Sequence, residues 1–446
     1  MRRFRETLDQ SWTYKRGGKH PSGEPAPGLL LLFTNGEPAL RAIPLRSGAL
    51  TLGRDELELE DSRLSRRHAE ARFDGQRWHL KDLGSRNGTF VDGKPITGEL
   101  ATDRARLLRV GDSLFGLLSD VRGFEGAVVE LRDGVLVGPT LRQRWDEIER
   151  AAQGGDTLHV TGESGTGKEL AARHFHRSGK RAGGPFVAVN CAAIPPNLAE
   201  RLLFGAKKGA YSGADADAEG HVQAANGGTL FLDEIAELEP PVQAKLLRVL
   251  ESREVTALGA SKPKPVDLGV VSATHQDLRA AAGAGKFRQD LFFRIARPQV
   301  TLPPLRDRIE EIPWLVQRAL TPSPAHVSLV EECLLRPWPG NVRELMVELK
   351  HAQLEAAKQK SQRVEVEHLS AEAGRELEAS GEAQPPGGGA SALSDDQILE
   401  ALRRENGNVT RTARAIGWHR NQLRRWLAKN RVDPAQLGDA EHEPEA

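Results

Sequence analysis

Hydrophobic and polar residues follow three different patterns along this chain. From Leu29 to about residue 118, short apolar runs separated by glycine-rich breaks predict an all-β sandwich. Near residue 160, an apolar strand, a glycine-rich turn and a helical segment follow one another, as they do in α/β domains. From Ala392 to Val432, three helical segments are separated by glycine breaks. A chain of 446 residues with three such patterns is expected to form several domains.

The β-rich region and the joint after it can be divided further. Its expected strands are Leu29–Phe33, Ala49–Leu52, Ala69–Phe73, Trp78–Asp82, Thr89–Val91 and Leu114–Leu118. Residues 119–150 form a joint, in which Leu141, Trp145 and Ile148 share one face of a predicted helix. Core packing explains that face without a functional role.

Three segments are not expected to pack a core. Residues 1–28 are basic and then rich in glycine and proline, which predicts a disordered leader, or a basic arm that touches a partner. Residues 371–391 end in QPPGGG and are interpreted as a linker. Residues 433–446 form a tail with five carboxylates and no lysine or arginine.

Composition restricts the class of protein and its partners. No apolar run is long enough to cross a bilayer, no secretory signal is present at the N-terminus, and a cytoplasmic protein is expected. Two cysteines, Cys191 and Cys333, cannot build a disulfide framework and are expected to be buried thiols. The formal net charge is zero, but residues 403–431 hold nine lysines and arginines against one acid. A compact basic unit suggests nucleic acid as one partner.

The glycine-rich turn has the spacing of a phosphate-binding loop. It follows the strand-like run Thr157–Thr161 and precedes a helix that begins near Leu170. Glycines let successive backbone N–H groups curl around phosphates, and a lysine reaches the outer phosphates. Glu169 stands where Ser or Thr would hold magnesium in the general motif. The residues expected to bind ATP here are Gly162, Glu163, Ser164, Gly165, Thr166, Gly167, Lys168 and Glu169.

A second stretch completes a nucleotide site. The apolar strand Thr229–Leu232 ends in two carboxylates, Asp233 and Glu234. Downstream of a phosphate-binding loop, Asp233 is expected near the magnesium ion and Glu234 where it can polarise an attacking water. ATP hydrolysis is therefore the central hypothesis, with ATP and Mg²⁺ as cofactors.

The last helical segments have the order of a helix-turn-helix. Ser394 is a plausible N-cap of the first helix, on which Ile398, Leu399 and Leu402 share a face. In the third helix, Leu423 and Leu427 face inward. The residues left to meet the major groove and phosphates of DNA are Arg420, Asn421, Gln422, Arg424 and Arg425.

Within the predicted sandwich, three polar pieces at strand ends and in loops resemble the forkhead-associated (FHA) domain, a reader of phosphothreonine. They are Gly53-Arg54, the run SRRH at 65–68 and the run SRNGT at 85–89. Planar guanidinium groups and a hydroxyl suit a phosphate dianion. The resemblance, over residues 29–119, implies that the phosphothreonine contacts Arg54, Ser65, Arg66 and Arg86, and that Asn87 binds the peptide main chain. His68 would brace the loop. The alternative is that Asn87-Gly88 is only a hairpin turn.

Residues 127–370 resemble the AAA+ domain of bacterial enhancer-binding proteins, which activate RNA polymerase carrying sigma-54. The resemblance rests on seven runs in order: GESGTGKE (162–169), FVAVNCAAI (186–194), LFGAKKGAYSGA (203–214), GGTLFLDEI (227–235), GKFRQDLFFRI (285–295), LPPLRDR (302–308) and WPGNVREL (338–345). Glu169 matches this family's own loop. The last helical segments, residues 392–432, resemble the Fis-type DNA-binding domain of the same family.

This resemblance assigns roles to further residues. Asn190 would hold Glu234 in an inactive pose, and Thr274 with His275 would form the first sensor, where the family often has Asn in place of His275. Arg288 and Arg294 would be arginine fingers that reach a neighbouring subunit's ATP, which implies a ring, expected to be a hexamer. Residue Arg343, on a helical lid, would be the second sensor.

One loop distinguishes this family from other AAA+ ATPases and would contact sigma-54. Its residues are Gly209, Ala210, Tyr211, Ser212, Gly213 and Ala214. The family typically has Phe at Tyr211 and Thr at Ser212, and both changes keep the chemical type. The expected chain is therefore a sigma-54-dependent regulator, with an FHA sensor for a phosphothreonine partner or Ser/Thr kinase and a tether to upstream promoter DNA. Two alternatives stay open: an AAA+ remodeller of another target, and a phosphopeptide and DNA adaptor with a spent ATPase.

Overall fold

The computed structural model describes residues 24–45, 48–210, 215–376, 395–405 and the single residues 408, 409, 412, 423, 427 and 432. The chain divides into two compact units, residues 1–377 and 378–446. Most of the predicted leader and linker, and the acidic tail, lie outside the described residues. Among the helices that are described, none has the length and apolar character needed to cross a membrane.

The first unit begins with a sandwich of two antiparallel sheets. One sheet has the order β2-β1-β10-β9-β6-β7 and the other β3-β4-β5-β8. The strands are β1 (Gly28–Thr34), β2 (Glu37–Pro44), β3 (Ala49–Leu52), β4 (Ala69–Phe73), β5 (Trp78–Asp82), β6 (Thr89–Val91), β7 (Lys94–Ile96), β8 (Glu99–Thr102), β9 (Leu107–Val110) and β10 (Ser113–Leu118), with the one-turn helix α1 (Arg54–Leu57) after β3.

All six predicted strands are present, and sequence reasoning missed β2, β7, β8 and β9. Three of these four are short, and β2, β7 and β8 hold no fully buried side chain, so they lack a strong apolar signal. By contrast, β1 and β10 are apolar without alternation because both of their faces are buried.

The predicted joint holds a hairpin and a helix. Strands β11 (Glu130–Arg132) and β12 (Val135–Val137) pair antiparallel, and α2 (Pro139–Gly154) follows. Its side chains Leu141, Trp145 and Ile148 are buried in the core of the next domain, which confirms the predicted core role of that face.

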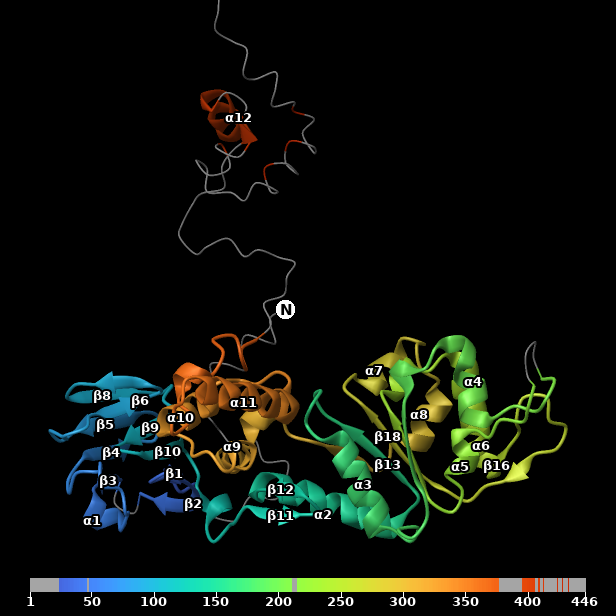
Figure 1. Cartoon of the computed structure of the whole chain (residues 1–446), viewed down its shortest axis with the longest axis horizontal. Coiled ribbons are helices and arrows are strands. Elements are labelled where there is room, and N and C mark those ends of the chain that lie inside the picture. Colours follow the sequence, from blue (N-terminus) through green and yellow to red (C-terminus); the bar gives the residue numbers. More distant parts are fainter. Residues whose placement is uncertain are drawn as a thin grey trace, which may run out of the picture. The chain divides into compact units, whose positions relative to one another are not determined.

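A five-stranded parallel sheet forms the centre of the next domain, in the order β14-β15-β18-β13-β19. The strands are β13 (Thr157–Thr161), β14 (Phe186–Asn190), β15 (Thr229–Asp233), β18 (Gly269–Thr274) and β19 (Gln299–Thr301). Their nearly continuous apolar runs suit burial on both faces. One face packs against α2 and α3 (Lys168–Ser178), and the other against α4 (Pro196–Phe204), α6 (Pro240–Ser252), α7 (Leu278–Gly283) and α8 (Gln289–Ile295) (Figure 1).

Smaller elements complete this domain. They are α5 (His221–Ala224) and the two-stranded pair β16 (Glu254–Val255) and β17 (Lys264–Pro265). Both cysteines are free and buried, as predicted: Cys191 follows β14, and Cys333 lies in the lid described next.

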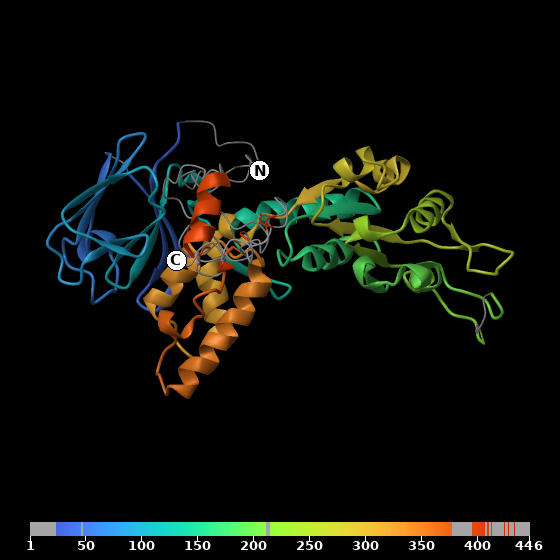
Figure 2. The ribbon, with the colours of Figure 1, turned by 90° about the horizontal axis from the view of Figure 1, so that it is seen from above.

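Three helices after β19 form a lid: α9 (Ile312–Leu320), α10 (Val327–Leu335) and α11 (Asn341–Lys358). Figure 2 shows these orange helices beside the blue strands of the sandwich, and side chains from both share one hydrophobic cluster. Lid contacts continue past residue 371, where the linker was expected to begin. Ala373 is buried in the same cluster, and Trp338 donates its backbone N–H to the carbonyl of Gly374 at 2.9 Å.

The second unit contains α12 (Asp395–Arg404). Ile398 and Leu402 of this helix are buried against Leu423 and Leu427. This small core confirms the predicted inward orientation of both later leucines.

Candidate functional sites

The phosphate-binding loop connects β13 to α3 at the carboxyl edge of the parallel sheet. Gly162, Gly165 and Gly167 have positive φ angles of 153°, 77° and 104°, which only glycine adopts without strain. The buried Lys168 folds back over the loop, with its Nζ 3.0 Å from the carbonyl oxygen of Gly162. The loop therefore presents a curled backbone around one ammonium group, as phosphate binding requires.

The two expected carboxylates lie on the neighbouring strand end. The register of β15 and β18 pairs Leu232 with Ser272, so Asp233 and Glu234 emerge beside the end of β18. Glu234 has a left-handed φ of 50°, an uncommon conformation for a residue other than glycine. Its Oε1 lies 3.6 Å from the Nζ of Lys168. The loop lysine and the candidate base thus belong to one site.

The first-sensor residues hold Glu234 directly. Its Oε2 lies 2.8 Å from Nδ1 of His275 and accepts a hydrogen bond of 3.2 Å from the hydroxyl of Thr274. Burial acts to raise the pKa of Glu234, but hydrogen bonds from His275 and the charge of Lys168 hold it below its usual value. Burial raises the pKa of the neighbouring Asp233 carboxyl. Glu234 is therefore kept ionised, as a general base must be.

Asn190, expected to hold Glu234, makes a different contact in this structure. It pairs in register with Asp233 on the adjacent strand, but its side-chain oxygen accepts from the backbone N–H of Ala192 at 3.0 Å. The hydrogen bonds to the Glu234 carboxylate come from the end of β18 instead.

The lid binds the phosphate loop through residues that lie far away in sequence. Arg343 donates to the hydroxyl of Ser164 at 3.3 Å. The side chain of Asn341, buried at the start of α11, donates to the carbonyl of Ser164 at 2.9 Å and to the carboxylate of Glu163 at 3.1 Å. Arg306, which lies between β19 and the first lid helix, forms a two-pronged ion pair with the same Glu163.

Asn341 lies in the run WPGNVREL and Arg306 in the run LPPLRDR, but no role was expected for either residue. Their types offered a signal, because a planar guanidinium and an amide both suit a carboxylate partner. Gly165 shows how closely the lid approaches the loop: a Cβ atom there would lie 2.1 Å from the carbonyl oxygen of Gly340.

The two expected arginine fingers lie at opposite ends of α8: Arg288 is its N-cap residue, and Arg294 lies in its last turn. The guanidinium of Arg288 pairs with Asp290, which raises its pKa, and Arg294 donates to the carbonyl of Leu250 at 3.1 Å. Between them, the side chain of Phe293 is 72% exposed. Arg294 therefore directly follows, in sequence, an apolar side chain that is open to solvent in this chain.

Only the start of the expected sigma-54 loop is described. Gly209 has a φ of 79°, and Ala210 donates its backbone N–H to the carbonyl of Lys207 at 3.0 Å. An isolated bridge between Ala206 and Ala218 closes the base of this loop. Tyr211, Ser212, Gly213 and Ala214 lie outside the described residues.

The sandwich brings together, around Ser65, the three segments that were predicted to bind a phosphopeptide. The backbone N–H of Arg54 donates to the Ser65 carbonyl at 3.2 Å, and that of Arg86 to the Ser65 hydroxyl at 3.3 Å. Gly53 permits this approach, because a Cβ atom there would lie 1.8 Å from the carbonyl oxygen of Arg66. The side chains of Arg54, Arg66 and Arg86 are exposed and available to an anion.

His68 and Asn87 fix the loops behind this surface. The buried His68 accepts from the backbone N–H of Ser65 through Nδ1, at 3.1 Å, so its Nε2–H donates to the carbonyl of Gly88 at 3.0 Å. Asn87 donates from its side chain to the carbonyl of Arg63 at 2.6 Å. The bracing contacts expected of His68 are thus present.

Comparisons with known proteins cover all three regions. A family model of the sigma-54 interaction domain matches residues 136–301, an FHA domain model matches residues 50–114, and a model of Fis-family bacterial regulatory proteins matches residues 393–429. The DNA-binding transcriptional regulator NtrC of Rhizobium meliloti (strain 1021) is 37% identical over 335 residues, which are 66% of this chain and 69% of NtrC. The chain belongs to the sigma-54 enhancer-binding proteins.

The matched share of the relative's own length varies among proteins similar to this enhancer-binding protein. The transcriptional regulatory protein XylR of Pseudomonas putida is 44% identical over 221 residues, which are 48% of this chain and only 39% of XylR. Among solved structures, the ATP complex of NtrX from Brucella abortus is 31% identical, covers 67% of this chain and 70% of NtrX, and has a TM-score of 0.50. The fold is thus an FHA sandwich, an AAA+ P-loop domain with a helical lid, and a C-terminal helix-turn-helix region.

The DNA-binding residues expected in this enhancer-binding protein are outside the described part of its second unit. They are Arg420, Asn421, Gln422, Arg424 and Arg425. The matched Fis-family region, residues 393–429, includes all five.

Proposed function

We propose that this enhancer-binding protein hydrolyses ATP to drive transcription initiation by RNA polymerase that carries sigma-54. One observation carries the proposal: Lys168 of the phosphate loop and Glu234 of the neighbouring strand lie 3.6 Å apart, with the lid residue Arg343 bound to the same loop. Such a cluster has a lysine for the outer phosphates, a base for water and a cation for developing charge.

The residues present fit ATP with magnesium. Three glycines with positive φ free the loop backbone to face phosphate oxygens, and Lys168 is buried among them. The Asp233 carboxylate, at the adjacent strand end, is an oxygen ligand of the kind magnesium prefers. Bound magnesium would neutralise charge on the phosphates, with Asp233 as its protein ligand.

Different side chains of this chain have different roles in ATP hydrolysis. Lys168 and the loop backbone position the phosphates, while Glu234 orients water and accepts its proton. Thr274 and His275 hold the Glu234 carboxylate, so a change in their position can alter the activity of the base. Arg288 and Arg294 act on the site of a neighbouring subunit in a homo-oligomeric ring, for which the exposed Phe293 offers apolar contact area.

The other two domains supply the input and the location. The exposed arginines around Ser65 bind a phosphothreonine, with Asn87 on the peptide main chain, so a phosphorylated protein or a Ser/Thr kinase is the expected partner. The helix-turn-helix holds the ring at DNA upstream of the promoter. The loop from Gly209 to Ala214 presses on sigma-54 when the nucleotide state changes.

The deciding experiment is open-complex formation by sigma-54 polymerase on a promoter with a bound upstream site. Wild type with ATP is expected to form open complexes, and Ser212→Ala is expected to lose them while keeping ATP hydrolysis. Glu234→Gln serves as the control that should lose both. If assembled wild-type rings hydrolyse ATP without forming open complexes, the target is not sigma-54. If rings bind ATP without turnover, the chain is an adaptor with a spent ATPase.

A further inference from the structure

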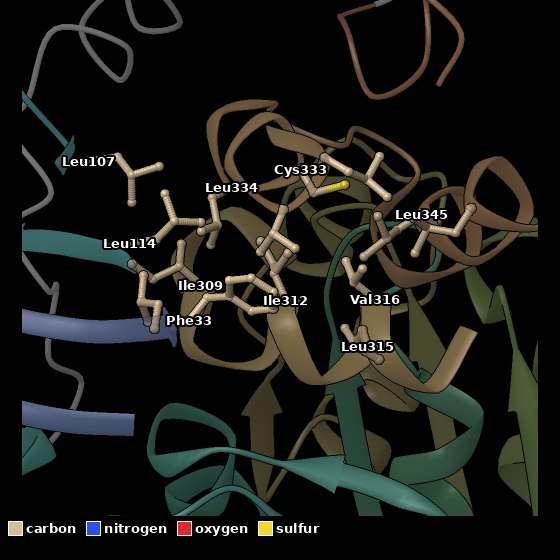
Figure 3. Close-up of a cluster of buried hydrophobic side chains, with 14 of the residues drawn as sticks. Phe33, Leu107, Leu114, Ile309, Ile312, Leu315, Val316, Cys333, Leu334 and Leu345 are labelled. Atoms are coloured by element: carbon tan, nitrogen blue, oxygen red, sulfur yellow. The ribbon is translucent and has the colours of Figure 1, made fainter. Parts of the chain in front are cut away.

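A single hydrophobic cluster joins the FHA sandwich to the lid of the ATPase. Figure 3 shows Phe33, Leu107 and Leu114 of the sandwich meeting Ile309, Ile312 and Leu334 of the lid region. All six side chains are nearly or fully buried. We call this cluster the FHA–lid seam.

The sandwich is built to be covered on this side. Along β1, Leu29 and Leu31 enter the core between the two sheets, whereas Leu30 and Leu32 enter the seam. Both pairs are almost completely inaccessible to solvent. If the sandwich were joined to the ATPase only by a flexible linker, Leu30 and Leu32 would be exposed to solvent. This face of the sandwich is therefore adapted to the lid.

Polar contacts orient the seam. Arg109 of β9 donates to the carboxylate of Glu331 on α10 at 2.7 Å, and Arg106 donates to the carbonyl of Leu335 at 3.0 Å. Glu331 is only 7% exposed at its side chain, and a buried carboxylate depends strongly on its partner. Hydrophobic contact alone would allow the surfaces to slide, and these directional bonds select one arrangement.

The seam connects to the phosphopeptide loops by two short routes. The guanidinium of Arg109 also stacks over Phe90 at 3.7 Å, and Phe90 lies three residues after Asn87. The second route starts at Asp61, whose buried carboxylate accepts from the backbone of Arg63 at 2.9 Å and from the hydroxyl of Ser113 at 2.8 Å. Ser113 precedes the seam residue Leu114.

On the lid side, the seam continues to the nucleotide site. Trp338 is fully buried in the same cluster and donates its ring N–H to the carbonyl of Cys333 on α10 at 2.7 Å. Three residues later, Asn341 contacts Glu163 and Ser164 of the phosphate loop. A packed path therefore runs from the phosphopeptide loops through α10 to the phosphate loop.

We propose that the FHA domain controls the ATPase through the lid: occupancy of its phosphothreonine site changes how the lid, held by the FHA–lid seam, closes on nucleotide. This inference rests on the proposed function and specifies its regulation. Any such effect must be reciprocal, so nucleotide would also change phosphopeptide affinity by the same factor. Typical couplings of this kind are about 5- to 150-fold in affinity.

Gly116 of β10 offers a local way to disturb the seam. A Cβ atom at this position would lie 3.5 Å from the Cδ1 of Ile309, an ordinary contact, so Gly116→Ala is a matched control. Gly116→Leu has no room and acts as a wedge between sandwich and lid. Glu331→Gln is a second variant that removes the charge of the ion pair at nearly constant shape.

The first measurement is the Kd of fluorescent ADP for the full chain, without peptide. Gly116→Leu is expected to change that Kd at least about fivefold relative to Gly116→Ala, and Glu331→Gln in the same direction. Circular dichroism checks that each variant is folded. Equal Kd values, within twofold, in all folded variants would overturn the inference.

The second measurement adds a degenerate peptide library with one fixed phosphothreonine, and the unphosphorylated library as control. In wild type and Gly116→Ala, the phosphorylated library is expected to change the ADP Kd at least about fivefold relative to the unphosphorylated library. In Gly116→Leu, the ratio of these two Kd values should be close to one. Binding without any shift in wild type refutes the inference but leaves the reader function intact. Failure of the library to bind refutes the reader function itself, and with it the phosphothreonine input.

Discussion

Glu311 provides a quantitative test of the packing between lid and phosphate loop. Its side chain is 1% exposed and accepts from the backbone N–H of Gly138 at 2.8 Å and from Arg308 at 3.1 Å. Arg308 also donates to the carbonyl of Thr166 in the phosphate loop at 3.0 Å. Burial, reinforced by the adjacent Glu310, raises the pKa of Glu311 from 4.5 to about 7, although Arg308 opposes the shift.

This shift predicts how the stability changes with pH. Below pH 4.5 the Glu311 carboxyl is protonated in both the folded and the unfolded chain, so it adds no pH dependence. As the pH rises from 4.5 to about 7, the unfolded chain releases the proton first, which favours unfolding. The free energy of unfolding should therefore fall with rising pH, by about 3 kcal/mol in total from this group at 1.36 kcal/mol per pH unit.

The assay is urea unfolding of wild type and Glu311→Gln at four pH values between 5 and 8. The difference between the two free energies of unfolding reports the contribution of Glu311 together with its interaction with Glu310, and Glu251→Gln, at an exposed position of α6, is the matched control. We expect wild type to lose roughly 2 to 3 kcal/mol relative to Glu311→Gln across this range, most of it below pH 7. A flat difference, or one that rises with pH, would refute the reasoning.

Two further predictions concern the ATPase and FHA sites. His275→Ala removes a hydrogen-bond donor from Glu234 and should lower kcat roughly tenfold or more, with little change in the Kd of ATP. The control His275→Asn keeps a donor and should retain more activity. Equal kcat values in wild type and His275→Ala would show that the contact does not orient the base. His68→Ala leaves the N–H of Ser65 and the carbonyl of Gly88 without their buried partner, and should destabilise the sandwich by about 2 kcal/mol or more and weaken phosphopeptide binding. Unfolding and peptide titration measure both effects, and unchanged stability would count against the bracing role of His68.

Much of this protein could be predicted from sequence because its signals are local. A phosphate loop needs glycines and a lysine at set spacing between a strand and a helix, so Gly162 to Lys168 predicts its own geometry. The inward leucines of the second unit follow from helical period in the same way. Cys191 and Cys333 were expected to be buried thiols, and burial raises the pKa of both to about 12.

Other features depend on contacts between residues that are distant in the chain. Glu163 lies 143 residues from Arg306 and 178 from Asn341, and no local pattern pairs them. The contact between Glu234 and His275 similarly requires two strand ends to meet at one edge of the sheet.

The FHA–lid seam shows most clearly which features follow from the sequence and which require the tertiary structure. The apolar run Leu29–Phe33 already indicates a strand buried on both faces, because an exposed face would call for alternating polar residues. It does not indicate what covers the second face. Only the tertiary structure shows that lid helices from residues 312–335 do so, since hydrophobic burial is non-directional and any complementary surface could satisfy it. Local period and spacing thus determined the domains and their motifs, whereas the fold decided which partners those motifs meet.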